Sequence, residues 1–123
     1  MPYVDGFVAA VPKANLDAYR AHVQAAWPIF EKLGVQAMWE CWGDDVPEGE
    51  VTSFRKAVKA TEDETVVFSW TVWPDKATRD AGWQKMMSDP EIGAAMGEMP
   101  FDGRRMIYGG FTPIARLGAA EPA

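Results

Sequence analysis

The sequence predicts an α+β domain in which an antiparallel sheet carries two main helices on one face. Apolar residues recur at intervals of three and four through residues 15–33, which is the spacing of an amphipathic helix. β-branched and aromatic residues fill shorter segments elsewhere, as is typical of strands. A chain of 123 residues, 48% of them hydrophobic, fits one domain with its own core. We place this domain at residues 1–116 and expect residues 117–123 to form a flexible tail.

The first strand and the first helix are predicted in the N-terminal third. Residues Tyr3–Val11 are apolar at alternate positions on both faces, with Asp5 as the exception. Pro12 lacks the backbone N–H that a strand ladder uses, so we expect the strand to stop there. Asn15 is a candidate N-cap for a helix that runs to about Leu33.

The middle of the chain predicts a helix end and two further strands. Pro28 predicts a kink or a local break, and Gly34 suits a helix C-terminus. Residues Val35–Gly43 form the second predicted strand, and an acidic loop follows. We expect Thr52–Ala60 to be extended, either as a continuation of the second strand after a bulge or as a separate strand. Residues Thr65–Trp73 are the strongest strand in the chain.

The C-terminal half predicts two helices and a final strand. Asp75 caps a helix over Lys76–Ser88, and Asp89 followed by proline begins a short helix over residues 91–97. An Asp-Gly turn at residues 102–103 precedes the last strand, Arg104–Ile114. The complete order is β-α-β-β-α-β, which is the ferredoxin-like arrangement.

Apolar residues on both faces of the strands predict an assembly. A sheet with helices on one face normally leaves its other face polar. The third predicted strand instead has Phe68 and Trp70 on one side and Val67 and Trp73 on the other. We therefore expect a homodimer in which two sheets cover one another.

Composition and charge exclude several classes of protein. The formal net charge is −6 and the isoelectric point is about 4.7, which disfavours nucleic acid and anionic membranes as partners. One cysteine and one histidine exclude an internal disulfide and any multi-Cys or multi-His metal site within one chain. The sequence has no secretory signal and no apolar run of about 18 residues. We expect a cytoplasmic protein with no metal and no cofactor.

Four segments together resemble a known family. The four segments are Tyr3–Val8, Glu40–Pro47 with Thr52–Phe54, Glu64–Trp70, and Met99–Phe111. The fourth is the most distinctive, and the resemblance covers nearly the whole chain, from about residue 2 to residue 112. The chain resembles the YbaA-like family of uncharacterised bacterial proteins, a branch of the dimeric α/β-barrel superfamily. The resemblance implies two ferredoxin-like units joined through their sheets, and it implies no particular reaction. Superfamily members include cofactor-independent monooxygenases, haem-degrading enzymes, isomerases and ligand-binding proteins, so the fold suggests only a location, the cleft between sheet and helices.

Glu40, His22 and Cys41 are the first candidates for chemistry. Glu40 and Cys41 are adjacent on the second predicted strand and so point to opposite faces, but the sequence leaves open which face each occupies. A carboxylate between two covered faces must be paired, protonated or directed into a cavity, and we name Arg79, Arg104 and Arg105 as candidate partners of Glu40. His22 lies at the flank of the apolar stripe of the first predicted helix. It could serve as a general base or a haem ligand, or it could be an ordinary residue at the boundary of the core.

The candidate sites support three functions. Candidate ligand-binding residues share a polar group near the expected cleft: Glu40, Ser69, Arg79, Arg105 and Tyr108. We expect Ser69 and Tyr108 on strands near the centre of the sheet. The first function is binding of a small apolar or aromatic molecule. The second is a cofactor-independent monooxygenase-like or isomerase-like reaction, with Glu40 or His22 as base and Arg105 or Tyr108 stabilising an anion. The third is a non-enzymatic interaction module.

Overall fold

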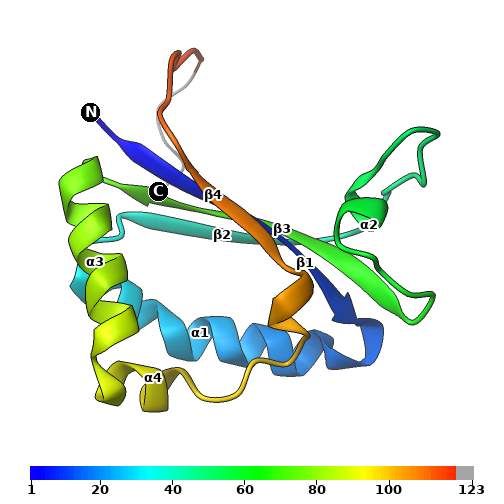
Figure 1. Ribbon diagram of the computed structural model, residues 1–123, viewed down its shortest axis with the longest axis horizontal. Coiled ribbons are helices and arrows are strands. Elements are labelled where there is room, and N and C mark those ends of the chain that lie inside the picture. Colours follow the sequence, from blue (N-terminus) through cyan, green and yellow to red (C-terminus); the bar gives the residue numbers. More distant parts are fainter. Residues whose placement is uncertain (119–123) are drawn as a thin grey trace.

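The computed structural model describes residues 1–118, and residues 119–123 of the expected tail lie outside the described part. The elements, in chain order, have these bounds: β1 Tyr3–Pro12, η1 Lys13–Asn15, α1 Leu16–Leu33, β2 Ala37–Trp42, α2 Phe54–Ala57, β3 Glu64–Trp73, α3 Lys76–Ser88, α4 Pro90–Met96, η2 Gly103–Arg105 and β4 Ile107–Phe111 (Figure 1). The strands and the main helices follow the predicted order.

The sheet has the ferredoxin-like topology. Its strand order is β2-β3-β1-β4, and all three neighbouring pairs are antiparallel. The two long strands β1 and β3 pair along their full length, from Tyr3 opposite Trp73 to Pro12 opposite Glu64. Pro12 is therefore the last residue of β1. The predicted α+β fold class is confirmed.

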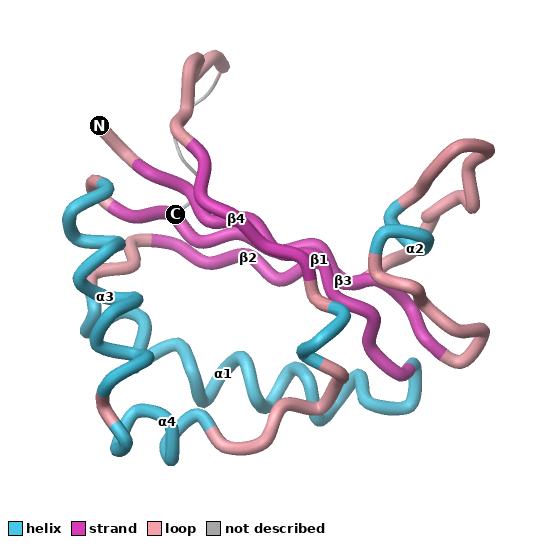
Figure 2. Tube along the Cα trace, viewed as in Figure 1, coloured by secondary structure: helices cyan, strands magenta, loops and turns pink. Residues whose placement is uncertain are grey.

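The helices divide unequally between the two faces of the sheet. α1, α3 and α4 lie on one side and α2 lies on the other (Figures 1 and 2). On the side of α1, a buried cluster joins the sheet to the helix through Ala9, Val11, Tyr19 and Val67. On the side of α2, Val58 packs against one end of the sheet and is fully buried. No helix of residues 1–118 is long and apolar enough to cross a membrane.

The first helix differs from its prediction at two positions. α1 is continuous from Leu16 to Leu33 with Pro28 inside it, so the predicted break is wrong. Asn15 occupies the N-cap position as predicted, but its side chain makes no capping hydrogen bond, because Nδ2 donates to the Pro100 backbone oxygen at 2.8 Å instead. Gly34 ends the helix as expected, with φ of 114°, a left-handed conformation that suits glycine.

The segment predicted as extended over Thr52–Ala60 contains the short helix α2. The Ser53 side chain accepts a hydrogen bond from the Lys56 backbone N–H at 3.0 Å and so caps this helix. Arg55 then donates to the backbone oxygens of Thr61 and Glu64, which fixes α2 against the start of β3. The prediction of an extended segment overlooked this local capping signal.

The last strand is shorter than the predicted Arg104–Ile114. Asp102 accepts from the Arg104 backbone N–H at 3.0 Å and begins the short helix η2. β4 therefore covers only Ile107–Phe111 and lies at the edge of the sheet. The caps of α3 and α4 are as predicted, since Asp75 accepts from the Thr78 backbone N–H and Asp89 from that of Glu91.

Candidate functional site

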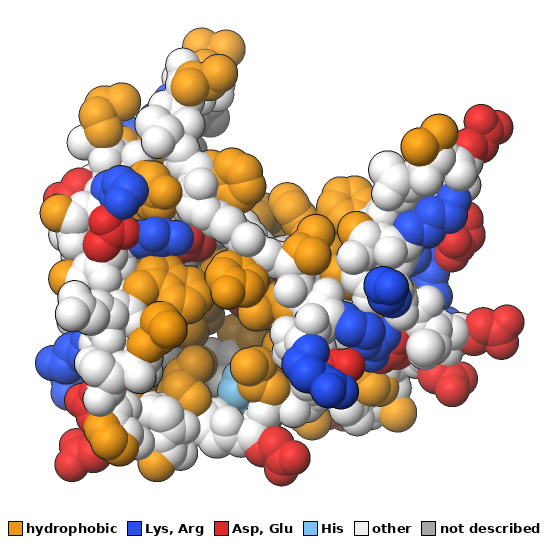
Figure 3. Space-filling model, in the orientation of Figure 1, with side chains coloured by type: hydrophobic (Ala, Val, Ile, Leu, Met, Phe, Trp, Pro, Cys, Tyr) orange, Lys and Arg blue, Asp and Glu red, His pale blue; other side chains and the backbone are white. Residues whose placement is uncertain are grey.

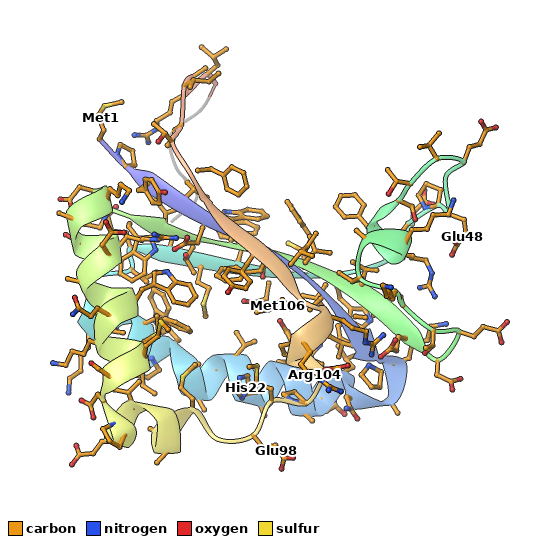
Figure 4. The ribbon with its side chains drawn as sticks, viewed as in Figure 1. Met1, His22, Glu48, Glu98, Arg104 and Met106 are labelled. Atoms are coloured by element: carbon orange, nitrogen blue, oxygen red, sulfur yellow. The ribbon has the colours of Figure 1, made fainter. Side chains whose placement is uncertain are left out.

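A cavity of about 250 Å³ lies between the sheet and the helices. Figure 3 shows it as a hollow among hydrophobic side chains, with the single histidine of the chain at its edge. Figure 4 shows His22 on α1, facing the space beneath the sheet, and Met106 just before β4. Most of the wall is aromatic or contains methionine: Phe7, Tyr19, Phe30, Trp73, Trp83, Phe101, Met38, Met86, Met96, Met99 and Met106.

Strand alternation decides which residues reach the cavity. Successive side chains point to opposite faces of a sheet, so one alternate set on each strand faces the helices. On β2 this set includes Glu40, which lines the cavity, while Cys41 belongs to the opposite set. On β3 it includes Ser69, Thr71 and Trp73. The orientation that the sequence left open is thereby settled.

Glu40 is held by neighbours from α1 and β3. The Tyr19 hydroxyl donates to Glu40 Oε1 at 2.6 Å, and Ser69, opposite Glu40 in the sheet register, also hydrogen-bonds to the carboxylate. Burial raises the pKa of Glu40, while the hydrogen bonds from Tyr19 and Ser69 act in the opposite direction. Burial also raises the pKa of Tyr19, as does the adjacent carboxylate, so the phenol stays protonated and donates. Glu40 is thus a partly buried carboxyl group, held by two hydrogen bonds, whose pKa lies above that of an exposed glutamate.

Tyr19 and Glu40 line two cavities. A second cavity of about 300 Å³ is also lined by Tyr19, Val23 and Glu40, together with residues of the opposite end of α1 such as Leu16 and Arg20. The hydrogen-bonded pair therefore borders both cavities.

Thr71 is the second polar feature of the cavity wall. Its side chain lines the cavity, the residue is only 5% exposed, and its Oγ1 atom has no hydrogen-bond partner among the described residues. A buried hydroxyl without a partner destabilises a protein by about 1–3 kcal/mol. Such a group is therefore available to a bound molecule.

Asp5 binds the two tryptophan side chains of the cavity wall. It is 1% exposed and accepts hydrogen bonds from Trp73 Nε1 at 2.9 Å and Trp83 Nε1 at 2.8 Å. Arg79 completes the cluster, with its NH2 group 2.8 Å from Asp5 Oδ1 and its guanidinium over the rings of Tyr3 and Trp83. Both indole rings that line the cavity are thus oriented by one carboxylate.

The three arginines proposed as partners of Glu40 lie elsewhere. Arg79 binds Asp5 and Asp80, which raises its pKa, and Arg104 lies 3.5 Å from Asp102. Arg105 donates to Glu64 at 2.6 Å and to Asp102 at 3.1 Å. The predicted Glu–Arg pair is wrong, because Tyr19 and Ser69 fill that role.

Tyr108 lies outside the cavity wall, on the edge strand β4 rather than near the centre of the sheet. It is 65% exposed and stacks on Trp83 and Phe7, with ring centroids 6.2 and 6.4 Å away. Ser69 lies on the central strand β3 as predicted. The structure therefore brings Glu40, Ser69 and His22 together at the cavity and leaves Arg79, Arg105 and Tyr108 around it.

The sequence did not predict the roles of three residues of the site: Asp5, Tyr19 and Thr71. Asp5 carried a signal, since it is the single charged residue in an otherwise apolar strand. Tyr19 lies in the apolar stripe of its helix, three positions before His22, and such a position predicts a core residue. The residue type of Thr71 is common in strands, so the sequence offered no signal for it.

Fold and cavity define a class of protein, a ferredoxin-like α+β domain with a mostly apolar space between its sheet and helices. A solved structure titled "Structure of Rv0793 from Mycobacterium tuberculosis" has this fold, with a TM-score of 0.50, 13% identity, and coverage of 96% of this chain and 100% of that one.

The chain belongs to the family described as "Protein of unknown function (DUF1428)", which it matches over residues 2–103. Relatives named "Uncharacterized protein YbaA" from Escherichia coli strain K12 and from Shigella flexneri are each 57% identical over 114 residues, which is 93% of this chain and 97% of theirs. The resemblance to the YbaA-like family is thus confirmed.

Proposed function

We propose that this protein binds a small apolar or aromatic molecule in the cavity between the sheet and α1. The observation that carries the proposal is the combination of an apolar wall with few polar groups, Glu40, Ser69 and Thr71, which lie together on the floor formed by β2 and β3. Ligand sites have this composition, because apolar surface supplies affinity and a few polar groups fix orientation.

The size of the cavity limits the ligand. An apolar cavity of roughly 150 Å³ accommodates benzene. A space of about 250 Å³ therefore suits a molecule of one or two rings rather than a large polycycle. Five methionines in the wall adapt to the outline of such a molecule through their flexible side chains: Met38, Met86, Met96, Met99 and Met106.

The test compares two variants of the same helix. Ala26 is 3% exposed and lines the cavity, whereas Ala25 is exposed to solvent. Ala26→Leu should fill part of the cavity and weaken the binding of one-ring and two-ring aromatic probes about tenfold, with Ala25→Leu as the matched control. Trp73 and Trp83 in the wall allow the binding to be followed by tryptophan fluorescence. Equal affinities in the two variants, or no binding by either or by the unaltered protein, would contradict the proposal.

A second candidate function is a cofactor-independent monooxygenase-like or isomerase-like reaction in the same cavity. The observation that favours it is the raised pKa of Glu40 in the cavity wall, since a partly buried carboxylate beside a bound molecule suits proton abstraction. Liquid chromatography with mass spectrometry, together with NMR of the probe after incubation, separates the two functions, because an isomerised probe keeps its mass and is recognised by its spectrum. A chemically changed probe with the unaltered protein, and an unchanged one with Glu40→Gln, supports the reaction; an unchanged probe in both cases supports binding alone.

We also propose that two copies of the chain associate through the sheet face that bears α2. Large apolar side chains remain about half exposed there: Trp39, Phe54, Phe68, Ile107 and Phe111. Three of them are connected through Trp70: Trp39 stacks on Trp70 at 5.7 Å between ring centroids, and Phe68 lies 5.5 Å from Trp70 and 5.9 Å from Phe54. A large aromatic side chain can bury about 150–250 Å². If each of the five side chains exposes about half of such an area, together they offer on the order of 500 Å² for contact. A stable dimer buries about 800 Å² per partner, so the rest of the area must come from partly buried residues of the same face, such as Trp70 and Val8.

The dimer is tested by native mass spectrometry with one substitution at the centre of that face. Phe68→Asp places a charge among the exposed aromatic residues and should give a monomer, whereas Glu62→Gln in the turn before β3 should leave the dimer intact. A monomer for the unaltered protein at micromolar concentration contradicts the proposal. In that case the apolar face itself would be the surface of an interaction module with a different partner.

A further inference from the structure

The cavity wall carries a negative group and lacks a basic side chain of lysine or arginine among the described residues. Glu40 is the acidic residue of the wall, and His22 and Tyr19 are its other titratable residues. Two arginines that were candidate partners of Glu40 bind other carboxylates instead: Arg79 binds Asp5, and Arg105 binds Glu64. An anionic ligand would thus meet a carboxylate with no lysine or arginine in the wall to offset it, whereas a cationic ligand would compensate its charge.

The apolar part of the wall also suits a cation. Aromatic faces attract ammonium groups through their quadrupole, and Trp is the most effective of them. The wall contains both Trp73 and Trp83, and their orientation is set by hydrogen bonds to Asp5. The formal net charge of −6 further raises the local concentration of cations near the protein.

Two hydrogen-bond acceptors remain available on the cavity floor. A carboxylate offers about four acceptor sites. Tyr19 and Ser69 occupy two of those of Glu40. Thr71 Oγ1, on the same face of β3 as Ser69, has no partner within residues 1–118. An ammonium group has three donors and no acceptor, so it matches this pair of acceptors.

We propose that the ligand of this cavity is a small protonated primary amine with an apolar or aromatic body. This assignment rests on the proposed binding function and adds its ligand class. The ammonium group donates to Glu40 and Thr71, and the apolar body lies among the methionine and tryptophan side chains. A neutral alcohol of the same shape keeps the apolar contacts but loses the attraction to the carboxylate, and a carboxylic acid is repelled by it.

The test uses three probes that share one ring and differ in charge: phenethylamine, phenethyl alcohol and phenylacetate. Their affinities are measured by isothermal titration calorimetry and tryptophan fluorescence on the full chain. The amine should bind about tenfold tighter than the alcohol, and phenylacetate should bind weakest. In Glu40→Gln the amine and the alcohol should bind within about twofold of each other.

Two further variants complete the design. Glu50→Gln removes the same charge from an exposed loop and should keep the preference for the amine, which separates the cavity carboxylate from the general charge of the protein. Thr71→Val should weaken amine binding several-fold, and it tests the assignment even where Glu40→Gln fails to fold.

Each other outcome has a definite meaning. If the alcohol binds as tightly as the amine, the amine assignment is overturned and the binding function stands. If the preference survives in Glu40→Gln, the role of Glu40 is overturned. If none of the three probes and none of the neutral aromatic probes binds, both the ligand class and the proposed function fail.

Discussion

Replacement of Asp5 should destabilise this protein more than that of any exposed aspartate. Asp5 is 1% exposed and accepts from two indole N–H groups and from Arg79. Asp5→Ala leaves these donors without their acceptor. We expect a large loss of stability together with a loosened cavity wall, because Trp73 and Trp83 both line the cavity.

The magnitude follows from the exposure of each donor. The Trp73 residue is 1% exposed, so its unpaired N–H costs about 2 kcal/mol. Breaking a buried ion pair costs about 3–5 kcal/mol. The lower end applies here, because the Arg79 side chain is 21% exposed and keeps Asp80 as a partner. The Trp83 N–H is partly buried, and water can replace part of its bond. The sum is about 5 kcal/mol, a large share of the roughly 5–15 kcal/mol that stabilises a typical domain.

Urea unfolding, followed by far-ultraviolet circular dichroism at one fixed protein concentration, measures this loss. Asp45→Ala, in an exposed loop, is the control and should change the free energy of unfolding by less than about 0.5 kcal/mol. Asp5→Asn retains one acceptor oxygen and should fall between the two. A loss below about 1 kcal/mol for Asp5→Ala, with an unchanged dependence on urea, would refute the reasoning.

Two further predictions concern hydrogen-bonded carboxylates. Tyr19→Phe removes a hydrogen bond that lowers the pKa of Glu40, so this pKa should rise further. Carbon-13 NMR of the side-chain carboxyl groups measures it, with the Glu40 signal assigned by its loss in Glu40→Gln. An unchanged pKa would contradict the contact. Arg105, mainly by hydrogen bonding, lowers the pKa of Glu64 from 4.5 to about 2. Because the unfolded chain then binds the proton more readily, this interaction stabilises the fold above about pH 4.5, and its contribution is lost as the pH falls toward 2. Arg105→Gln should flatten that part of the stability profile in acid denaturation, and a profile equal to that of the unaltered protein would argue against it.

Local sequence signals predicted the elements that depend on neighbouring residues. Asp75 and Asp89 begin helices because each lies within two or three positions of the backbone N–H that it accepts. The same kind of signal at Ser53 was present and overlooked. Asn15 shows the limit of such signals, because its side chain donates a hydrogen bond to the backbone oxygen of Pro100, 85 positions away, instead of capping the helix.

The candidate site was predicted in location and only in part in its residues. Alternation on the second strand required Glu40 and Cys41 to face opposite ways, yet a period of two cannot say which of them faces the helices. Glu40 was correctly expected to be paired or directed into a cavity, but an arginine was expected as its partner. A tyrosine of the apolar stripe of α1 serves instead, since Tyr19 packs in the core and points its hydroxyl at β2.

The sequence by itself determined the order of elements, the four strands with apolar residues on both faces, and the acidic charge, because each depends on residue types and short spacings. Only the tertiary structure decided which acid meets which base. Asp5 is 74 positions from Arg79, and Glu64 is 41 positions from Arg105. Chemically equivalent pairings could have joined these residues differently. The strand register and the placement of α3 over β1 select one of them, because a charged group stays buried only where its partner lies within hydrogen-bond distance.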